Sequence, residues 1–153
     1  MRGIYHFYKI SGQLSCAGQP TEDQLKQLAA EKYEVIINLG LLNTKYSLPD
    51  EAGLAKELGL NYHHIPVNFE KPQLTELADF IGLMNQHSGS KTMVHCAANY
   101  RASVFTGLYL LAAGKMDKEE MEDFIDDIWQ PNTVWQQLLE DGIDYLEGRT
   151  SNG

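Results

Sequence analysis

The chain has 153 residues, of which 43% are hydrophobic and 22% are charged, and its formal net charge is −9 at neutral pH. This length and composition predict one soluble globular domain, residues 1–153, with a full hydrophobic core. The acidic surface would repel the phosphates of a nucleic acid, so we expect no nucleic-acid partner.

The sequence shows no membrane, export or metal signal. No apolar run approaches the about 18 residues of a membrane span, and the N-terminal stretch "MRGIYHFYKISG" lacks the apolar core of a signal peptide. The two cysteines lie far apart and no cluster has the spacing of a metal site. We therefore expect a cytoplasmic protein without membrane contact, metal or cofactor, although a leader removed by processing would leave no trace here.

In the first half of the chain, short apolar runs alternate with amphipathic stretches. Residues 4–10, "IYHFYKI", predict an edge strand. Thr21, with Gln24 three residues later, is a capping-box start for a helix over 21–30. Residues 35–39 are typical of a buried strand. The stretch "PDEAGLAKELG" predicts a helix closed by Gly59, and 62–67 predict the next strand.

The second half continues this alternation. A helix is expected over roughly 74–87, a strand over 92–96, and a strongly apolar helix over 102–113 ended by Gly114. A further helix begins at Asp117, where Glu120 completes a capping-box pattern, and a last one follows Pro131. Trp129 and Trp135 are expected to pack between these last two helices. Strands alternating with helices indicate an α/β fold with a mainly parallel sheet.

The segment "VHCAANYRAS", residues 94–103, places a cysteine at the carboxyl end of a strand, where parallel sheets bind their ligands. The amides of the residues that follow would wrap around an anion, with a helix N-terminus behind them; these residues are Ala97, Ala98, Asn99, Tyr100, Arg101 and Ala102. Such amides and Arg101 favour the thiolate form of Cys96, which is the competent nucleophile.

Supporting roles are predicted around this loop. Arg101 offers a planar fork for a tetrahedral oxyanion. Ser103 would donate a hydrogen bond to the sulfur, His95 would bond the loop backbone, and Tyr100 would form a wall of the pocket. The alternative interpretation makes Cys96 a small buried apolar residue and Arg101 a surface charge.

The segments "GQPTEDQLKQLAAEKYEVIINL", "YHHIPV" and "VHCAANYRAS" together resemble the bacterial beta-lactamase hydrolase-like phosphatase family, within the protein tyrosine and dual-specificity phosphatase fold. The resemblance covers roughly residues 10–115 in motif order. It implies a four- to five-stranded sheet flanked by helices, with the cysteine loop between the central strand and a core helix. It also implies that Cys96 is the nucleophile and Arg101 the anion-binding residue.

Three features depart from the classical phosphatase signature. Four residues instead of five separate Cys96 from Arg101, the loop contains no glycine, and Ala102 comes between Arg101 and Ser103. The shorter loop resembles the persulfide-forming loop of rhodanese sulfurtransferases, and some beta-lactamase hydrolase-like proteins are labelled sulfur transferases. The fold resemblance therefore leaves the reaction open.

Ester hydrolysis also needs a general acid that protonates the leaving oxygen. In the phosphatase fold an aspartate supplies it from the loop after the strand that precedes the third helix. Here that loop, residues 67–72, holds Asn68, which has no proton to give, and Glu70, the candidate acid. Glu70 is alternatively a solvated loop carboxylate. Asp50 is a second candidate, although its position also fits a helix N-cap.

Three functions are consistent with these residues. The first is a hydrolase that cleaves phosphate monoesters of a small molecule or a phosphoprotein through a phosphocysteine on Cys96. The second is a sulfurtransferase that takes a sulfane sulfur as a Cys96 persulfide. The third is a non-catalytic domain that binds a phosphorylated or sulfated ligand, with phosphate or sulfate at the loop. Cys16 is either a resolving cysteine for an oxidised Cys96 or a buried thiol.

Overall fold

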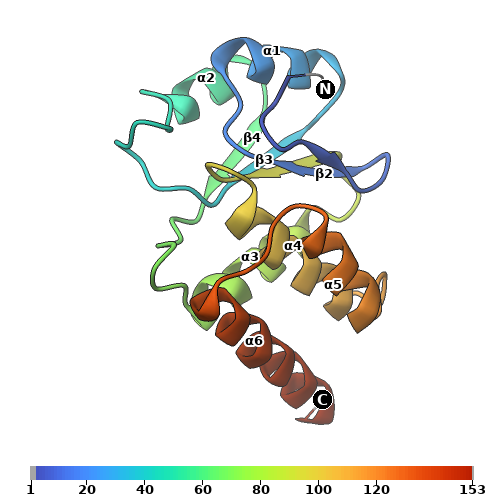
Figure 1. Cartoon of the computed structure of the whole chain (residues 1–153). Helices are drawn as coiled ribbons and strands as arrows, with labels where there is room; N and C mark the ends of the chain where they lie inside the picture. The colour runs from blue at the N-terminus through green and yellow to red at the C-terminus, as the bar shows by residue number, and fades with distance from the viewer. Residues whose placement is uncertain (1–2, 153) are drawn as a thin grey trace.

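The computed structural model describes residues 3–152. Its elements, in chain order, are β1 (Tyr8–Lys9), β2 (Leu14–Ala17), α1 (Glu22–Ala30), β3 (Val35–Asn38), α2 (Glu51–Glu57), β4 (Asn61–His64), α3 (Leu74–Gln86), β5 (Thr92–His95), α4 (Tyr100–Ala112), α5 (Lys118–Asp126) and α6 (Thr133–Asn152). Figure 1 shows α1 and α2 on one face of the sheet and α3, α4, α5 and α6 on the other.

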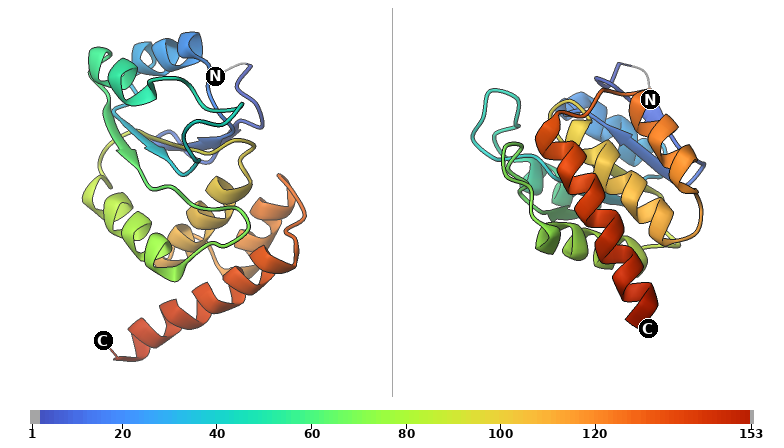
Figure 2. Two further views of the ribbon diagram at one scale, coloured as in Figure 1. Left: turned by 90° about the vertical axis from the view of Figure 1, so that its left-hand side faces the viewer. Right: turned by 60° about the horizontal axis from the view of Figure 1, so that its bottom comes forward.

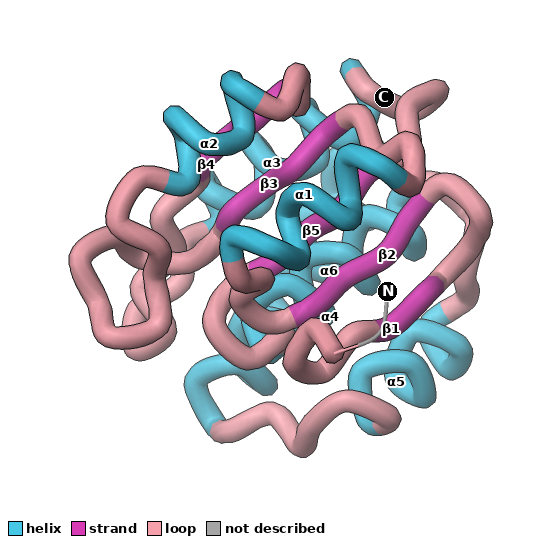
Figure 3. Tube along the Cα trace, turned by 90° about the horizontal axis from the view of Figure 1, so that it is seen from above, coloured by secondary structure: helices cyan, strands magenta, loops and turns pink. Residues whose placement is uncertain are grey.

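The sheet has the strand order β1-β2-β5-β3-β4, which Figure 3 shows from above. The strands β2, β5, β3 and β4 pair in parallel, and β1 pairs antiparallel with β2 at one edge. This arrangement confirms the predicted α/β class and mainly parallel sheet. Since β5 is the central strand, its carboxyl end opens between those of β2 and β3, and the segment that follows it is surrounded on both sides.

Each central strand contributes side chains to two hydrophobic clusters, as expected of strands buried on both faces. On β3, Ile36 joins Leu25 and Leu28 of α1, whereas Ile37 faces the larger cluster under α3, α4 and α6. Helix α4 lies within that larger cluster, and ten of its 13 residues are buried. The two views in Figure 2 show α4 enclosed by α3, α5 and the long α6. The cysteine loop is therefore anchored between a central strand and a fully packed helix.

Several element boundaries differ from the predictions. The expected edge strand over 4–10 is reduced to Tyr8–Lys9, because residues before it turn back through His6 at φ 50° and a bond from Phe7 N to Ile4 O. Strand β2 was not predicted. The strand expected over 62–67 is Asn61–His64, and α4 begins at Tyr100, two residues before the expected start. None of the described helices is long and apolar enough to cross a membrane.

Candidate active site

Cys96 directly follows β5 and is 1% exposed. The chain then turns through Asn99, the N-cap of α4, whose φ of 70° lies in the left-handed region that asparagine tolerates better than most residues. Ala102 N donates to Cys96 Sγ at 3.5 Å. The sulfur therefore lies against the N-terminus of a 13-residue helix, where the dipole and unpaired amides favour an anion.

The N-terminal segment and β2 hold this loop from outside. His6 Nδ1 lies 2.9 Å from Ala98 O, and Asn99 Nδ2 donates to His6 O at 2.8 Å. Gly18 forms a bridge to Ala98, and a Cβ at position 18 would lie 2.5 Å from Ala97 O. Only glycine allows so close an approach, so Gly18 lets the loop lie directly against the end of β2.

Arg101 lies in the first turn of α4 and is 9% exposed. Its Nη1 donates to Val67 O at 2.9 Å, whereas its Nε, also buried, has no hydrogen-bond partner among the described residues. A buried donor on a cation is costly to leave unpaired. Arg101 and Ala97 line a cavity of about 330 Å³. Arg101 therefore brings a positive charge and an unpaired buried donor to the wall of this cavity.

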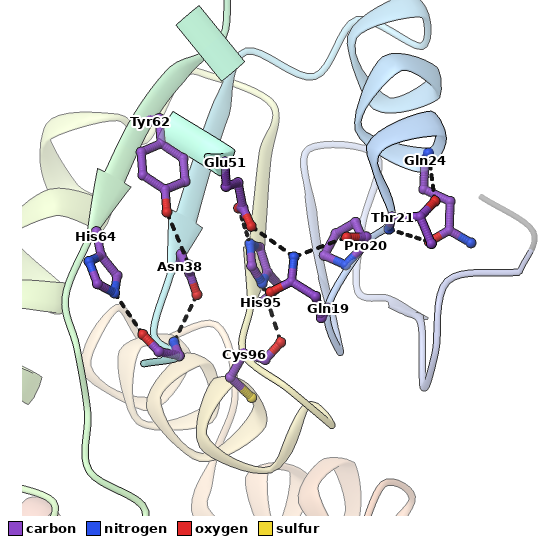
Figure 4. A network of polar contacts seen from close by, with 11 residues as sticks. Gln19, Pro20, Thr21, Gln24, Asn38, Glu51, Tyr62, His64, His95 and Cys96 are labelled. Atoms are coloured by element: carbon purple, nitrogen blue, oxygen red, sulfur yellow. Dashed lines mark hydrogen bonds and ion pairs between the residues drawn. The ribbon is translucent and has the colours of Figure 1, made fainter. Parts of the chain in front are cut away.

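His95, the last residue of β5, forms a buried pair that the sequence did not predict. Its Nε2 lies 2.5 Å from Glu51 Oε2, and the two side chains are 0% and 2% exposed. Gln19 Nε2 donates to Glu51 Oε1 at 2.8 Å, and His95 Nδ1 lies 3.3 Å from Cys96 O. Figure 4 shows this chain of contacts from Gln19 through Glu51 and His95 to Cys96. Through the contact of His95 Nδ1 with Cys96 O, this buried pair fixes the backbone of the cysteine.

Burial alone would raise the pKa of the Glu51 carboxyl. The charge of His95 and the hydrogen bonds from His95 and Gln19 outweigh that effect and hold this pKa below its ordinary value. Because the folded pKa is lowered, the stability contributed by the carboxylate is present above its unfolded pKa of about 4.3 and is lost as the pH falls through the folded value.

We expect Glu51→Gln to lower the free energy of unfolding by about 1–3 kcal/mol at neutral pH, since a charged hydrogen bond is lost while the shape is kept. The difference from wild type should shrink as the pH falls below about 4.3. Urea unfolding at neutral and acid pH measures both effects. Glu57→Gln, at an exposed position of the same helix, is the control. Equal stability of Glu51→Gln and wild type at neutral pH would contradict this role.

The end of β3 supports the site from the other side. Asn38 Nδ2 donates to Tyr62 Oη at 3.0 Å, and Asn38 Oδ1 accepts from Gly40 N at 2.8 Å. His64 Nε2 lies 2.6 Å from Gly40 O. A Cβ at position 40 would lie 3.7 Å from Cys96 Cα. As Figure 4 shows, these side chains fix the turn after β3 next to the cysteine.

The loop between β4 and α3 forms the opposite wall of the cavity. Asn68, Phe69 and Glu70 all line it. Asn68 Oδ1 accepts from Glu70 N at 2.9 Å, so Asn68 shapes the turn that presents Glu70. Glu70 is exposed on the cavity rim. Asp50, the second candidate acid, is the N-cap of α2 and accepts from Gly53 N at 3.0 Å.

Aromatic residues fix this loop relative to Arg101. Trp135 Nε1 donates to Phe69 O at 2.8 Å, and the Phe69 and Trp135 rings stack with centroids 5.8 Å apart. The Tyr100 ring stacks on Trp129 at 4.4 Å, with 7° between the planes. The sequence had indicated that the two tryptophans pack between α5 and α6. The structure shows that they also contact Phe69 and Tyr100. Together with the bond from Arg101 to Val67 O, these contacts hold the loop after β4 against the first turn of α4.

Ser103 differs in role from the prediction, whereas Cys16 fits one of its two predicted alternatives, a buried thiol. Ser103 Oγ donates to Tyr100 O at 2.9 Å and accepts from Trp129 Nε1 at 3.2 Å. It therefore stabilises the first turn of α4, and the bond to the sulfur that we expected from Ser103 is supplied by Ala102 N instead. Cys16 is fully buried on β2. Burial raises the pKa of its thiol to about 12, against a hydrogen bond from Asn99 that lowers it.

The structure thus brings together most of the predicted site residues. Arg101 and Ala97, the neighbour of the buried Cys96, line one cavity together with Glu70 and Asn68. Tyr100, which was predicted to form a wall of the pocket, is not among the lining residues of this cavity. The sequence analysis missed Glu51, Gln19, Phe69 and the contacts of the two tryptophans. Gln19 was quoted within the "GQP" segment, which was the one signal available for it.

Comparison with known proteins gives a consistent picture. No family model matches the chain. A beta-lactamase hydrolase-like protein of Xylella fastidiosa (strain Temecula1) is 28% identical over 116 residues, which are 74% of this chain and 27% of that protein. The chain thus spans about a quarter of the length of this curated relative.

Solved structures match over nearly the whole chain. The crystal structure of a DUF442 candidate phosphatase from Shewanella putrefaciens CN-32 has a TM-score of 0.87 and 33% identity, over 95% of both chains. A kinase-associated phosphatase with its catalytic-site cysteine replaced by serine has a TM-score of 0.81 at 15% identity, over 96% of this chain and 98% of that one. The fold is therefore that of the protein tyrosine and dual-specificity phosphatases.

Proposed function

Because the chain belongs to the DUF442 family of phosphatase-like proteins, we propose that it hydrolyses phosphate monoesters through a phosphocysteine intermediate on Cys96. The observation that carries this proposal is Arg101, which lines the cavity with Ala97, the neighbour of the buried Cys96, and whose Nε is a buried donor without a partner among the described residues. A tetrahedral oxyanion bound there would satisfy this donor, and the helix N-terminus would favour its charge.

In the proposed reaction the Cys96 thiolate attacks phosphorus, and a sulfur–phosphorus bond forms as the bond to the leaving oxygen breaks. Glu70 gives its proton to that oxygen. Water then attacks phosphorus, Glu70 takes a proton from it, and the sulfur leaves as thiolate with release of inorganic phosphate. Arg101 and the loop amides stabilise the equatorial oxygens throughout by position and charge. The substrate is a phosphorylated small molecule or a phosphoprotein.

A second candidate function is sulfur transfer. It is favoured by the short loop, with four residues between Cys96 and Arg101, and by the exposure of Glu70, since this reaction needs no acid for a leaving oxygen. The Cys96 thiolate would attack the sulfane sulfur of thiosulfate, displace sulfite and hold the sulfur as a persulfide. A thiol acceptor would then take it. The third candidate, anion binding without catalysis, uses the same Arg101 and loop amides.

One parallel assay separates the three functions. The wild-type protein is incubated with p-nitrophenyl phosphate and, separately, with thiosulfate, and p-nitrophenol, sulfite and the intact mass are followed. The proposed function predicts p-nitrophenol release at mildly acidic to neutral pH. Sulfite release with one added sulfur on Cys96, and no p-nitrophenol, would establish sulfur transfer in its place. If neither product forms, a rise in unfolding temperature on addition of inorganic phosphate would establish the binding role.

Glu70→Gln tests the acid separately from the nucleophile. We expect this substitution to lower kcat for phenyl phosphate, whose leaving group needs a proton, by about 10²-fold. The loss for p-nitrophenyl phosphate should be several times smaller, because its leaving group is a weaker base. The comparison of the two esters is the readout, and Glu76→Gln in α3 serves as a control on net charge. Equal losses for both esters would contradict the assignment of Glu70 as the acid.

A further inference from the structure

A second cation lies in the wall of the active-site cavity. Residues 40–49 form a loop between β3 and α2 that projects from the sheet on the same side as the loop after β4 (Figure 1, Figure 2). This β3–α2 loop contributes Lys45 to the cavity of about 330 Å³ that also contains Arg101 and Glu70. Among the lining residues, these three are the charged ones.

The charge of the cavity is opposite to that of the whole chain. The chain has 12 lysines and arginines against 21 aspartates and glutamates, whereas two of the three charged residues in the cavity wall are cations. Lys45 and Arg101 are therefore the positive charges that an anionic substrate meets in this cavity. Such charges attract an anionic substrate to the cavity.

The two cations have different positions and different partners. Arg101 is buried, is bonded to Val67 O and lies in the first turn of the helix that follows Cys96, so we assign it to the reacting phosphate. Lys45 is exposed, and its Nζ lies 5.0 Å from the centroid of the Tyr46 ring, which also lines the cavity. This cation–π contact favours an ammonium position beside the ring. Lys45 is therefore available to a different group of the substrate.

The same loop also carries apolar surface. Leu41, Leu42 and Tyr46 are 39%, 51% and 59% exposed, and they are three of the five large hydrophobic residues that are exposed in the described chain. Leu41 and Tyr46 line the cavity with Lys45. The rim thus offers contacts to the organic part of an ester as well as a positive charge.

We propose that the substrate carries a second anionic group, a carboxylate or a phosphodiester, beside the phosphate that is cleaved, and that Lys45 binds this second group. The inference rests on the proposed phosphatase function and names the class of its substrate. The required chemistry occurs in soluble phosphorylated acids and in the headgroups of anionic phospholipids.

The test compares phenyl phosphate with 3-carboxyphenyl phosphate, which differ by one anion and little in the leaving oxygen. The wild type should show a kcat/KM for the carboxylated ester that is about three- to fivefold higher, the size expected of one solvent-exposed ion pair. Lys45→Met should abolish this preference, which is measured as the ratio of the two kcat/KM values within each variant, so that a general effect of the lost charge on both esters does not count. Lys71→Met, which removes an exposed lysine next to Glu70 that does not line the cavity, should keep the preference.

The two levels of the proposal fail in distinguishable ways. Equal kcat/KM values for the two esters in the wild type, or a preference that survives Lys45→Met, would overturn the inference and leave the phosphatase function intact. No hydrolysis of either ester would overturn the function and the inference with it. If Lys71→Met and Lys45→Met both lost the preference, the cause would be net charge and not binding by Lys45. That result would also overturn the inference.

A second arm distinguishes the two sources of such a substrate. Phosphatidylinositol monophosphate, which holds both a phosphate monoester and a phosphodiester, is offered in phosphatidylcholine vesicles and as its deacylated, soluble headgroup. Faster phosphate release from vesicles, lowered by a Leu41→Ser/Leu42→Ser double substitution, assigns the apolar rim to lipid contact. Faster release from the soluble headgroup assigns the substrate to the soluble class. In both cases Lys45→Met should slow phosphate release, and an unchanged rate would contradict the proposal.

Discussion

Cys96→Ser is expected to lower kcat for p-nitrophenyl phosphate by about 10⁴-fold or more, because a serine hydroxyl at this position has no base to activate it and cannot replace a thiolate as the nucleophile. The side chain is 1% exposed and the replacement is nearly the same size, so the fold should persist. Steady-state kinetics with matched thermal unfolding curves measure both properties.

The second cysteine provides a matched control. Cys16 is fully buried on β2, and burial raises the pKa of its thiol to about 12, so it is protonated at neutral pH. It does not line the cavity. Cys16→Ala should therefore retain kcat within a few-fold of the wild type. Full activity in Cys96→Ser would contradict the assignment of Cys96 as the nucleophile. Loss of activity in a folded Cys16→Ala variant would contradict it as well.

Arg101→Ala is expected to lower kcat/KM for p-nitrophenyl phosphate by about 10³-fold, since removal of one preorganised donor to a developing oxyanion already costs about 10²–10³. Arg101→Lys should be almost as damaging, because an ammonium lacks the planar fork that reaches both Val67 O and the phosphate. Both variants should also lose the rise in unfolding temperature that inorganic phosphate gives the wild type.

The phosphate effect must be judged against each variant's own baseline. Removing the guanidinium leaves Val67 O buried without its donor, which lowers stability by about 1–3 kcal/mol whether or not the protein binds phosphate. The readout is therefore the shift in unfolding temperature caused by phosphate within each variant. A phosphate shift of wild-type size in Arg101→Ala would contradict anion binding at this site, and it would contradict the alternative binding role as well.

The parts of the fold that were predicted correctly depend on local interactions. The capping boxes at Thr21 and Asp117 form as their spacing indicates, because donor and acceptor lie three residues apart. The parallel sheet follows from the alternation of apolar runs and amphipathic stretches. Cys96 was placed correctly at the carboxyl end of a strand because the strand and the apolar helix are adjacent in sequence.

The parts that were missed depend on residues far apart in the chain. Strand β2 consists of Leu14–Ala17, whose small residues give no strand pattern, and it becomes a strand by pairing with β1 and β5. The bond between Glu51 and His95 spans 44 positions. The bond from Trp135 to Phe69 spans 66 positions. No local sequence pattern connects such distant residues, so the contacts that support the site can be seen only in the folded structure.

The start of α4 differs from the prediction because a contact between distant residues shifted the helix boundary. The loop was expected to extend to Ala102, but Asn99 takes a left-handed conformation and is fixed by its bond to His6 O, so the helix begins at Tyr100. This places Arg101 in the first helical turn and not in the loop before the helix. As a result, its guanidinium donates a hydrogen bond to Val67 O and adds a positive charge to the cavity wall.

The central claim is that Cys96 becomes covalently phosphorylated during turnover. The most direct measurement is to mix the wild type with radiolabelled phosphate ester, quench in acid at successive times, and locate the label by peptide mapping. We predict one phosphoryl group on the peptide that contains Cys96, formed early and lost as phosphate is released, and no label in Cys96→Ser. Label on another residue, or turnover with Cys96 free of phosphate at every quench time, would contradict it.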